Sequence, residues 1–315
     1  MVDLHTPGGV LRAVDDVSFT VQKGRTLALL GESGCGKSLT AQSIVGLLDP
    51  VAEVSGGAAF LGETDVLTLD RAGRREIAGP KLAIVFQDAL TALNPVQPVG
   101  RQLAEPFRIH RGLSRRAARA EAIELMGRVG IPEPAARYRS YPHQFSGGMR
   151  QRLLIAMAVA LGPDVLLADE PTTALDVTVQ AQIMQLLRDL QTERDMAVVL
   201  ITHDLALVAE RADDVAVMYA GNVVETGPVR EVFDHPRHPY TKGLLDSVPE
   251  HARKGVPLPA VAGSPPELSL IPSGCVFQAR CPLAADRCVQ ERPQLEPAGD
   301  GRAAACHFAE ELTHA

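Results

Sequence analysis

The sequence has little that would take the protein into a membrane, out of the cell or onto nucleic acid. No run of eighteen apolar residues occurs, and no basic segment followed by an apolar stretch opens the chain, so we expect neither a membrane-spanning helix nor a secretion signal. With 31 Lys and Arg against 38 Asp and Glu, the formal net charge is −7. Nucleic-acid-binding proteins need clustered positive charge to displace counterions from phosphates. We therefore expect a cytosolic protein with no nucleic-acid partner.

Cysteine is scarce until the last part of the chain. Cys35 stands alone, and four further cysteines then follow with the spacing C-x5-C-x6-C-x17-C, at Cys275, Cys281, Cys288 and Cys306. In a cytosolic protein this crowding indicates metal or redox chemistry rather than disulfides. Four thiolates suit a tetrahedral zinc ion or an iron–sulfur cluster, with His307 as a possible substitute ligand, and the spacing alone does not choose between the metals. Four reduced structural cysteines are the alternative.

Alternating strand and helix patterns predict an α/β core. Apolar runs at 26–30, 165–169 and 197–202 indicate strands of a parallel sheet that is covered on both faces. Apolar residues recur at helical spacing over 176–191, which predicts a packed helix. The length of 315 residues would permit one large domain or two smaller ones.

Two segments depart from this alternation. Strand signals stop between Asn94 and Leu161, where 114–130 and 147–161 read as helices, so we predict an all-helical insert at about 94–161. Beyond Asp234 prolines accumulate and argue against long regular elements. We predict a first domain over 1–234 and a small, loop-rich appended domain over 235–315.

The segment GESGCGKS, from Gly31 to Ser38, fits the phosphate-binding loop pattern G-x-x-x-x-G-K-[ST]. An apolar strand precedes it and a helical pattern follows, which is the required context. The glycines let the backbone turn so that N–H groups face the phosphates, Lys37 reaches the β- and γ-phosphates, and Ser38 offers its hydroxyl to Mg²⁺. We expect Cys35 to be a small space-filling residue whose side chain points away from the nucleotide, although oxidation of its thiol could block ATP binding.

An acidic pair supplies the second half of a nucleotide site. Asp169 ends the apolar run VLLAD, and Glu170 follows it. Ends of parallel strands lie at the ligand-binding edge of such sheets, so Asp169 suits the Mg²⁺ ion and Glu170 can polarise the attacking water. Gln87 and His203 also follow apolar runs; taken alone, each reads as an ordinary turn residue.

The chain closely resembles the ATP-binding cassette (ABC) ATPases over roughly residues 10–230. The resemblance rests on the string FSGGMRQR, from Phe145 to Arg152, taken together with the phosphate loop, Gln87, the acidic pair, PTTALD ending at Asp176, and His203. The resemblance implies a P-loop fold with a mixed or parallel core sheet, an antiparallel β subdomain and an inserted helical subdomain. It also implies a head-to-tail dimer in which Ser146, Gly147 and Gly148 of one subunit clamp the ATP held by the other. Gln87 would sense Mg²⁺ and the attacking water, His203 would hold the γ-phosphate, and Asp176 would link the two sites. The nucleotide-contacting residues of the loop would be Gly31, Ser33, Gly34, Gly36, Lys37, Ser38 and Leu39.

More specific strings resemble the oligopeptide/dipeptide branch of ABC importers, above all HPYTKGLLDSVP at 238–249, with TALNPV at 91–96. This branch implies an ATPase on the cytoplasmic face of the membrane, attached peripherally. Its partners would be two transmembrane permease subunits, a second ATPase subunit (a paralogue or a second copy) and an extracytoplasmic substrate-binding protein. The resemblance also implies a [4Fe–4S] cluster on the four late cysteines, in a small Cys-rich C-terminal domain.

Departures and rival interpretations remain. Relatives carry about ten more residues before the first strand and an aromatic that stacks on adenine, whereas here only His5 is near; either the start is truncated or adenine is held weakly. Met149 replaces a common Gln of the signature without an expected loss of activity. The rival class is a soluble ABC ATPase of DNA repair or translation, which acts as an ATP-driven clamp without a transporter. Such proteins usually have paired cassettes or a long coiled-coil insert, whereas this sequence shows one cassette and a helical insert of modest length. A third interpretation treats the cysteine segment as an electron-transfer module.

Overall fold

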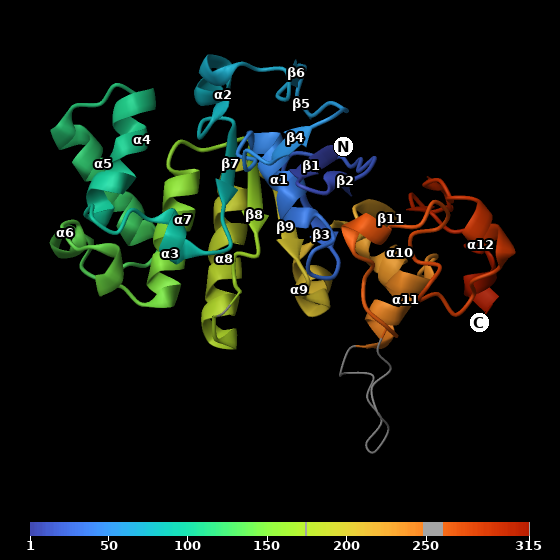
Figure 1. Cartoon of the computed structure of the whole chain (residues 1–315). Coiled ribbons are helices and arrows are strands. Elements are labelled where there is room, and N and C mark those ends of the chain that lie inside the picture. The colour runs from blue at the N-terminus through green and yellow to red at the C-terminus, as the bar shows by residue number, and fades with distance from the viewer. Residues whose placement is uncertain (174, 248–260, 315) are drawn as a thin grey trace. The chain divides into compact units, whose positions relative to one another are not determined.

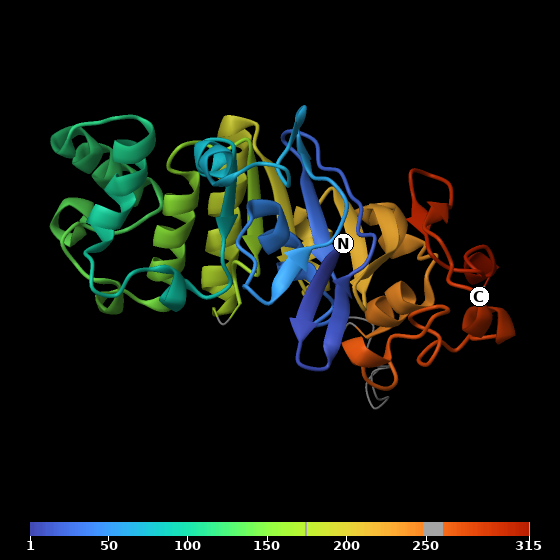
Figure 2. The same ribbon diagram turned by 45° about the horizontal axis from the view of Figure 1, so that its top comes forward.

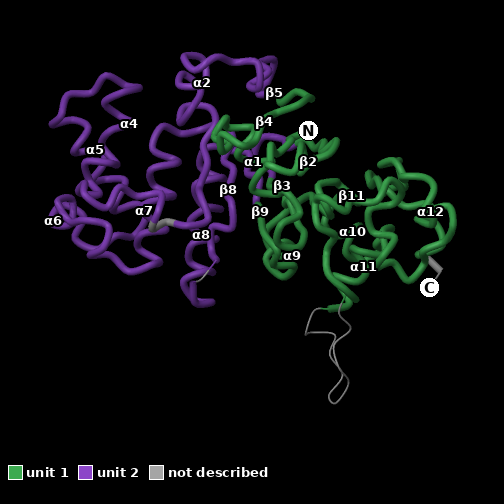
Figure 3. Tube along the Cα trace, in the orientation of Figure 1, with its two compact units in different colours: residues 1–20, 26–59, 201–315 green, residues 21–25, 60–200 purple. Residues whose placement is uncertain are grey.

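The computed structural model describes residues 1–173, 175–247 and 261–314, and it divides into two compact units (Figures 1 and 3). Unit 1 comprises residues 1–20, 26–59 and 201–315, and unit 2 comprises 21–25 and 60–200. Residues 261–314 therefore belong to the same unit as the phosphate loop, and they do not form a compact unit of their own. The domain boundary expected at residue 234 stays a prediction.

Unit 1 contains a small antiparallel sheet and one end of the mixed sheet. The small sheet has the order β2-β1-β4, and its paired strands lie side by side in blue in Figure 2. In the mixed sheet the order is β12-β13-β11-β10-β3, with β10 parallel to β3 and antiparallel to β11. The strands of unit 1 are β1 (Val2–Thr6), β2 (Gly9–Val14), β3 (Thr26–Leu30), β4 (Ala52–Val54), β10 (Asp214–Tyr219), β11 (Asn222–Pro228), β12 (Glu296–Pro297) and β13 (Ala303–Ala304).

The helices of unit 1 are short, and those after Asp234 agree with the prolines that argue against long regular elements there. They are α1 (Lys37–Val45), α9 (Leu205–Arg211), α10 (Val229–Asp234), α11 (Pro239–Asp246), α12 (Asp286–Gln290) and the 3₁₀ turns η3 (Leu268–Leu270) and η4 (Glu311–His314). The two-residue strand β13 pairs with β11, so the C-terminal residues extend the sheet that contains β3. All five residues of β3 are buried, and each large apolar side chain of such a strand stabilises the fold by about 1.5–3 kcal/mol.

Unit 2 combines parallel strands with the helical insert. Strand β7 (Leu82–Val85) pairs in parallel with β8 (Val165–Asp169), and β9 (Ala197–Thr202), in which the unit boundary falls, is the next strand in the order. The predicted strands 26–30, 165–169 and 197–202 are confirmed at the same bounds. A hairpin of β5 (Phe60–Leu61) and β6 (Thr64–Asp65) precedes α2 (Arg71–Ile77).

Every described element between Asn94 and Leu161 is helical, as the sequence predicts. After α3 (Ala89–Ala92), the chain forms α4 (Val99–His110), α5 (Arg115–Arg128), α6 (Pro134–Arg137), the 3₁₀ turn η1 (Pro142–Gln144) and α7 (Gly147–Val159). The predicted helix over 176–191 is α8 (Val177–Arg194). Within the described residues, no helix has both the length and the apolar character needed to cross a membrane.

Candidate functional site

The phosphate loop joins β3 to α1, and close backbone packing requires its glycines. A Cβ atom on Gly31 would lie 2.3 Å from the carbonyl oxygen of Met218. Gly36 has φ of 101° and caps α1, and a Cβ there would approach the carbonyl oxygen of Ala13 to 3.0 Å. A side chain at either position would displace the loop or strain its backbone.

Lys37 is the first residue of α1 and folds back over the loop. Its Nζ donates to the carbonyl oxygens of Gly31 (2.7 Å) and Glu32 (2.9 Å), and the side chain is buried. Gly36 offers no side-chain oxygen to the first turn of the helix. A helix N-terminus, a turning glycine loop and a lysine together form a donor set that fits nucleotide phosphates.

Cys35 fills the space beneath this loop. The side chain is buried, and burial raises the pKa of its thiol. Its Sγ nevertheless lies 3.7 Å from Nζ of Lys37, so it faces the lysine rather than pointing away from it.

The strand ends of unit 2 bring Gln87 and Glu170 together. Nε2 of Gln87 donates to Oε2 of Glu170 at 2.6 Å, and Oγ1 of Thr173 donates to the same oxygen at 2.8 Å. Asp169 is buried at the end of β8. Glu170 has φ of +44°, a left-handed conformation that costs a non-glycine residue roughly 1–2 kcal/mol. Such backbone strain persists mainly where function fixes the geometry.

The SGG string and PTTALD begin two helices of unit 2. Ser146 caps α7, and its hydroxyl accepts from the N–H of Met149 at 3.3 Å. Asp176 caps α8 in the same way, since Oδ1 accepts from the N–H of Val179 at 3.0 Å. Gly148 lies where α7 approaches α8, because a Cβ on it would lie 2.6 Å from Cγ1 of Val179.

The two histidines near the predicted site differ in their surroundings. His203 follows β9 with an exposed side chain, just before Asp204, which caps α9 by accepting from the N–H of Leu207. His5 lies on β1, and its Nε2 is 2.9 Å from Oε1 of Glu53. His5 is thus half of an exposed pair.

The predicted [4Fe–4S] cluster is wrong. Among the described residues, which include all four late cysteines, no three His, Cys, Asp or Glu side chains are grouped so that they could hold a metal ion. Cys275 and Cys288 instead lie in an apolar cluster with Phe277, and Cys281 packs against it. Burial raises the pKa of Cys275, of Cys281 and, to about 12, of Cys306.

His307 belongs to no metal-binding group among the described residues, and its Nε2 lies 3.0 Å from the carbonyl oxygen of Glu291. Cys275, Cys281 and Cys288 therefore lie in or against the apolar cluster, whereas Cys306 is half-buried and its Sγ accepts from the N–H of Phe308 at 3.4 Å.

The sequence interpretation missed a contact between the phosphate loop and the C-terminal residues. Arg280 forms a bidentate ion pair with Glu32, and the hydroxyl of Tyr240 accepts a hydrogen bond from the N–H of Glu32. Tyr240 lies in HPYTKG, a string that signalled family membership, but nothing in its pattern indicated which residue it would meet.

Comparisons with known proteins bear on the family of this chain. The ABC transporter family model matches residues 14–173, and the model described as "Oligopeptide/dipeptide transporter, C-terminal region" matches 224–288. A putative peptide import ATP-binding protein of Brucella abortus is 52% identical over 97% of this chain and 92% of its own length. The dipeptide transport ATP-binding proteins DppD of Bacillus subtilis and Escherichia coli are 52% and 48% identical over 89% and 94% of this chain, and 84% and 91% of their own lengths.

A solved structure of a dimeric ATP-binding cassette, in a post-hydrolysis state with ADP and phosphate, is 29% identical to this chain. It covers 73% of this chain and 99% of its own, with a TM-score of 0.63. These similarities do not favour the rival DNA-repair or translation clamp. The chain belongs to the ABC transporter family, among the ATP-binding proteins of peptide importers.

Proposed function

We propose that this chain hydrolyses ATP to power the import of di- or oligopeptides or related solutes through partner membrane proteins. The observation that supports this most is the match over nearly the whole length to peptide-import ATP-binding proteins, which extends beyond the cassette into the C-terminal region. Taken by themselves, the loop of unit 1 supplies donors for phosphate groups and the strand end at Glu170 in unit 2 supplies an oriented carboxylate, which are kinds of group that ATP hydrolysis requires.

In this proposal each predicted residue keeps its role. The loop from Gly31 to Leu39 binds the phosphates, Glu170 polarises the attacking water, and His203 holds the γ-phosphate. Mg²⁺ would be held by the hydroxyl of Ser38, the amide oxygen of Gln87 and the carboxylate of Asp169, which are the oxygen ligands that this ion prefers, and it would neutralise phosphate charge.

The proposed assembly is a dimer of ATPase subunits. Ser146, Gly147 and Gly148 would contact the ATP bound to the other subunit, and Asp176 would link the two sites. The second subunit is a paralogue or another copy of this chain. Two permease subunits and an extracytoplasmic substrate-binding protein complete the importer, with this chain at the cytoplasmic face of the membrane. We further propose that residues 1–234 form the cassette and 235–315 its extension.

Glu170→Gln tests the ATPase. The variant keeps the size and hydrogen bonding of the side chain but removes its charge, so we expect ATP binding to persist, hydrolysis to fall at least about 100-fold and an ATP-dependent dimer to accumulate. Glu133→Gln is the matched control, because Glu133 also has a positive φ, 48°, and is an exposed residue that precedes α6. Near-normal turnover in Glu170→Gln would remove Glu170 from its role.

The transport part of the proposal has a separate test. A tagged chain purified from membranes in mild detergent should bring two membrane proteins with it, and deletion of its gene should abolish peptide uptake. A chain that hydrolyses ATP but copurifies with no membrane protein would favour the soluble-clamp class instead.

A further inference from the structure

Glu32 is the second residue of the phosphate loop, and three of its groups are bonded within unit 1. Its carboxylate accepts from Arg280 twice, Nη1 to Oε2 at 2.7 Å and Nη2 to Oε1 at 3.0 Å. Its N–H donates to the hydroxyl of Tyr240 at 3.0 Å, and its carbonyl oxygen accepts from Lys37. Tyr240 and Arg280, which both lie beyond the proposed cassette of residues 1–234, therefore hold the loop directly beside Gly31.

Arg280 is itself held rigidly. Its side chain is 4% exposed, and besides Glu32 its guanidinium donates to the carbonyl oxygens of Ala262 (2.7 Å) and Val261 (3.3 Å) and to the hydroxyl of Tyr219 (3.4 Å). The five acceptor contacts equal the five N–H groups of a guanidinium. The bonds to Glu32 raise the pKa of Arg280 further, so the charge is permanent.

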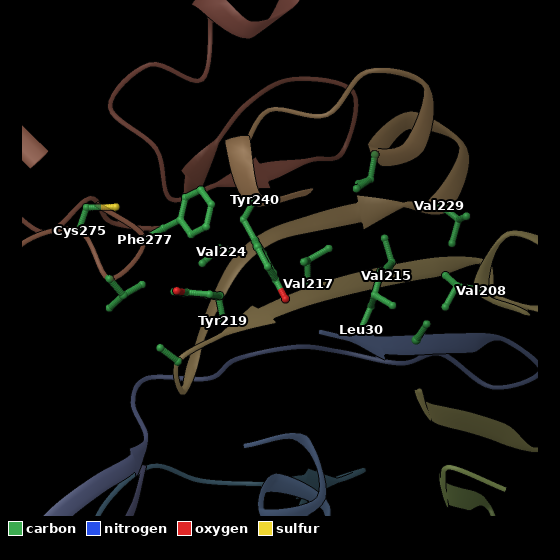
Figure 4. Close-up of a cluster of buried hydrophobic side chains, with 14 of the residues drawn as sticks. Leu30, Val208, Val215, Val217, Tyr219, Val224, Val229, Tyr240, Cys275 and Phe277 are labelled. Atoms are coloured by element: carbon green, nitrogen blue, oxygen red, sulfur yellow. The ribbon is translucent and has the colours of Figure 1, made fainter. Parts of the chain in front are cut away.

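The rings around the ion pair form one packed group, shown in Figure 4. The centroid of Tyr240 lies 4.7 Å from that of Tyr219 and 5.4 Å from that of Phe277. The guanidinium carbon of Arg280 lies 5.6 Å from the Tyr219 ring centroid, a distance at which cation–π attraction operates. Tyr240 is fully buried, and burial raises the pKa of its phenol, so the hydroxyl remains neutral.

The side chain of Arg280 is buried and that of Glu32 is 28% exposed, so removal of Glu32 would leave a desolvated guanidinium without its charged partner. A phosphate loop that is held in one conformation before the nucleotide arrives binds more tightly, since no ordering cost is paid on binding. The glycine-rich loop has intrinsic freedom, and the contacts to Glu32 restrict that freedom at one end.

We propose that Arg280 and Tyr240 are positioning residues for nucleotide binding: they hold Glu32, and through it the turn of the phosphate loop, in the conformation that receives ATP. The C-terminal residues of the chain are then part of the ATP site's support. This inference rests on the proposed ATPase function and adds residues after the cassette strands to it.

The test compares Arg280→Gln with Arg292→Gln in the full-length protein. Arg292 is also a residue of the C-terminal part of unit 1 that forms an ion pair with the N-terminal part, since its Nη1 lies 2.5 Å from Oδ2 of Asp15. Neither residue of this pair belongs to the phosphate loop. We expect Arg280→Gln to raise the Kd for Mg·ATP about tenfold and Arg292→Gln to leave it within about twofold. The kcat at saturating ATP should change little in both, because neither touches Glu170.

Two further variants separate positioning from folding. Tyr240→Phe keeps the ring packing and removes only the acceptor of the Glu32 N–H, so it should raise the Kd about threefold with an unchanged circular dichroism spectrum. It decides the matter if Arg280→Gln does not fold. In a double-mutant cycle, Arg280→Gln should cost nothing further in a Glu32→Gln background, because Arg280 acts through Glu32.

The outcomes distinguish the two proposals. If the wild-type chain binds no Mg·ATP, the ATPase function fails and the positioning role fails with it. If the wild type binds Mg·ATP and the Arg280 and Tyr240 variants match it in Kd, or Arg292→Gln weakens binding as much as Arg280→Gln, only the positioning role is overturned. A loss of about tenfold in Arg280→Gln and about threefold in Tyr240→Phe, with Arg292→Gln within about twofold of the wild type, supports it.

Discussion

Gln87 donates from Nε2 to Oε2 of Glu170 over 2.6 Å, and this bond joins the ends of two adjacent parallel strands. Thr173 donates to the same carboxylate oxygen. Hydrogen bonds to a carboxylate favour its charged form and fix its direction. The pair of donors therefore fixes the direction of the Glu170 carboxylate, as a residue that polarises water requires.

The two donors should differ in their effect on turnover. Gln87→Ala removes a bond to Glu170 and the amide proposed to contact Mg²⁺, so we expect kcat for ATP hydrolysis to fall about 10- to 100-fold. Thr173→Val removes only the second bond to the same oxygen and should lower kcat about two- to fivefold. Steady-state ATPase assays on both variants give the comparison, and equal losses would show that Gln87 acts only by orienting Glu170.

Alanine substitutions at the two glycines of the SGG string should differ in their effect on stability. Gly148→Ala places a methyl group 2.6 Å from Cγ1 of Val179, a stiff β-branched side chain, so we expect a loss of about 1–3 kcal/mol in unfolding free energy. Gly147→Ala is the control, because its new methyl would meet Leu175 Cδ2 at an ordinary 3.7 Å. Urea unfolding measures both. Val179→Ala should restore stability to Gly148→Ala, and failure to do so would mean that the clash is not the cause.

Parts of this molecule could be predicted because local signals determined them. The strands 26–30 and 165–169 are continuous buried apolar runs bounded by turns, and the meeting of Gln87 with Glu170 follows from parallel pairing. Arg280 and Glu32 are 248 positions apart, and no periodicity relates one arginine to one glutamate over such a distance. Crowded cysteines suggested a metal, but spacing does not reveal burial, and Cys275 and Cys288 are buried in an apolar cluster against which Cys281 packs.

Lys37 provides a test that separates binding from folding. Its Nζ donates to two loop carbonyls and to Sγ of Cys35, and a buried charge without a carboxylate partner among the described residues adds little to stability. We expect Lys37→Met to raise the Kd for Mg·ATP at least about 100-fold, while its melting temperature equals or exceeds that of the wild type. Binding of a fluorescent ATP analogue and thermal unfolding measure the two quantities. A large drop in melting temperature would instead assign Lys37 to the support of the loop.

Buried Glu225 and His238 should give stability an unusual dependence on pH. Burial raises the pKa of Glu225 from 4.5 to about 7, although its carboxylate accepts from the N–H groups of Arg237 (2.7 Å) and His238 (3.0 Å). Burial lowers the pKa of His238 from 6.5 to about 3. Between pH 4.5 and 7 the folded state thus holds more protons at Glu225 than the unfolded chain does, and between pH 3 and 6.5 it holds fewer at His238.

The two groups act in opposite directions. The contribution of Glu225 is fully present below pH 4.5 and is lost as pH rises through about 7, whereas that of His238 is present above pH 6.5 and is lost as pH falls toward 3. Each slope of stability against pH reaches at most about 1.4 kcal/mol per pH unit, so the two slopes largely cancel near pH 5.5.

Glu225→Gln removes the contribution of Glu225, and the stability of this variant relative to the wild type should therefore increase between pH 5 and pH 8. Urea unfolding across this range measures the difference. Glu291→Gln is the control, because Arg287 lowers the pKa of exposed Glu291 below 4.5, so its difference should change only in more acidic solution. A Glu225→Gln difference that stays constant with pH would mean that Glu225 titrates alike in the folded and unfolded chains.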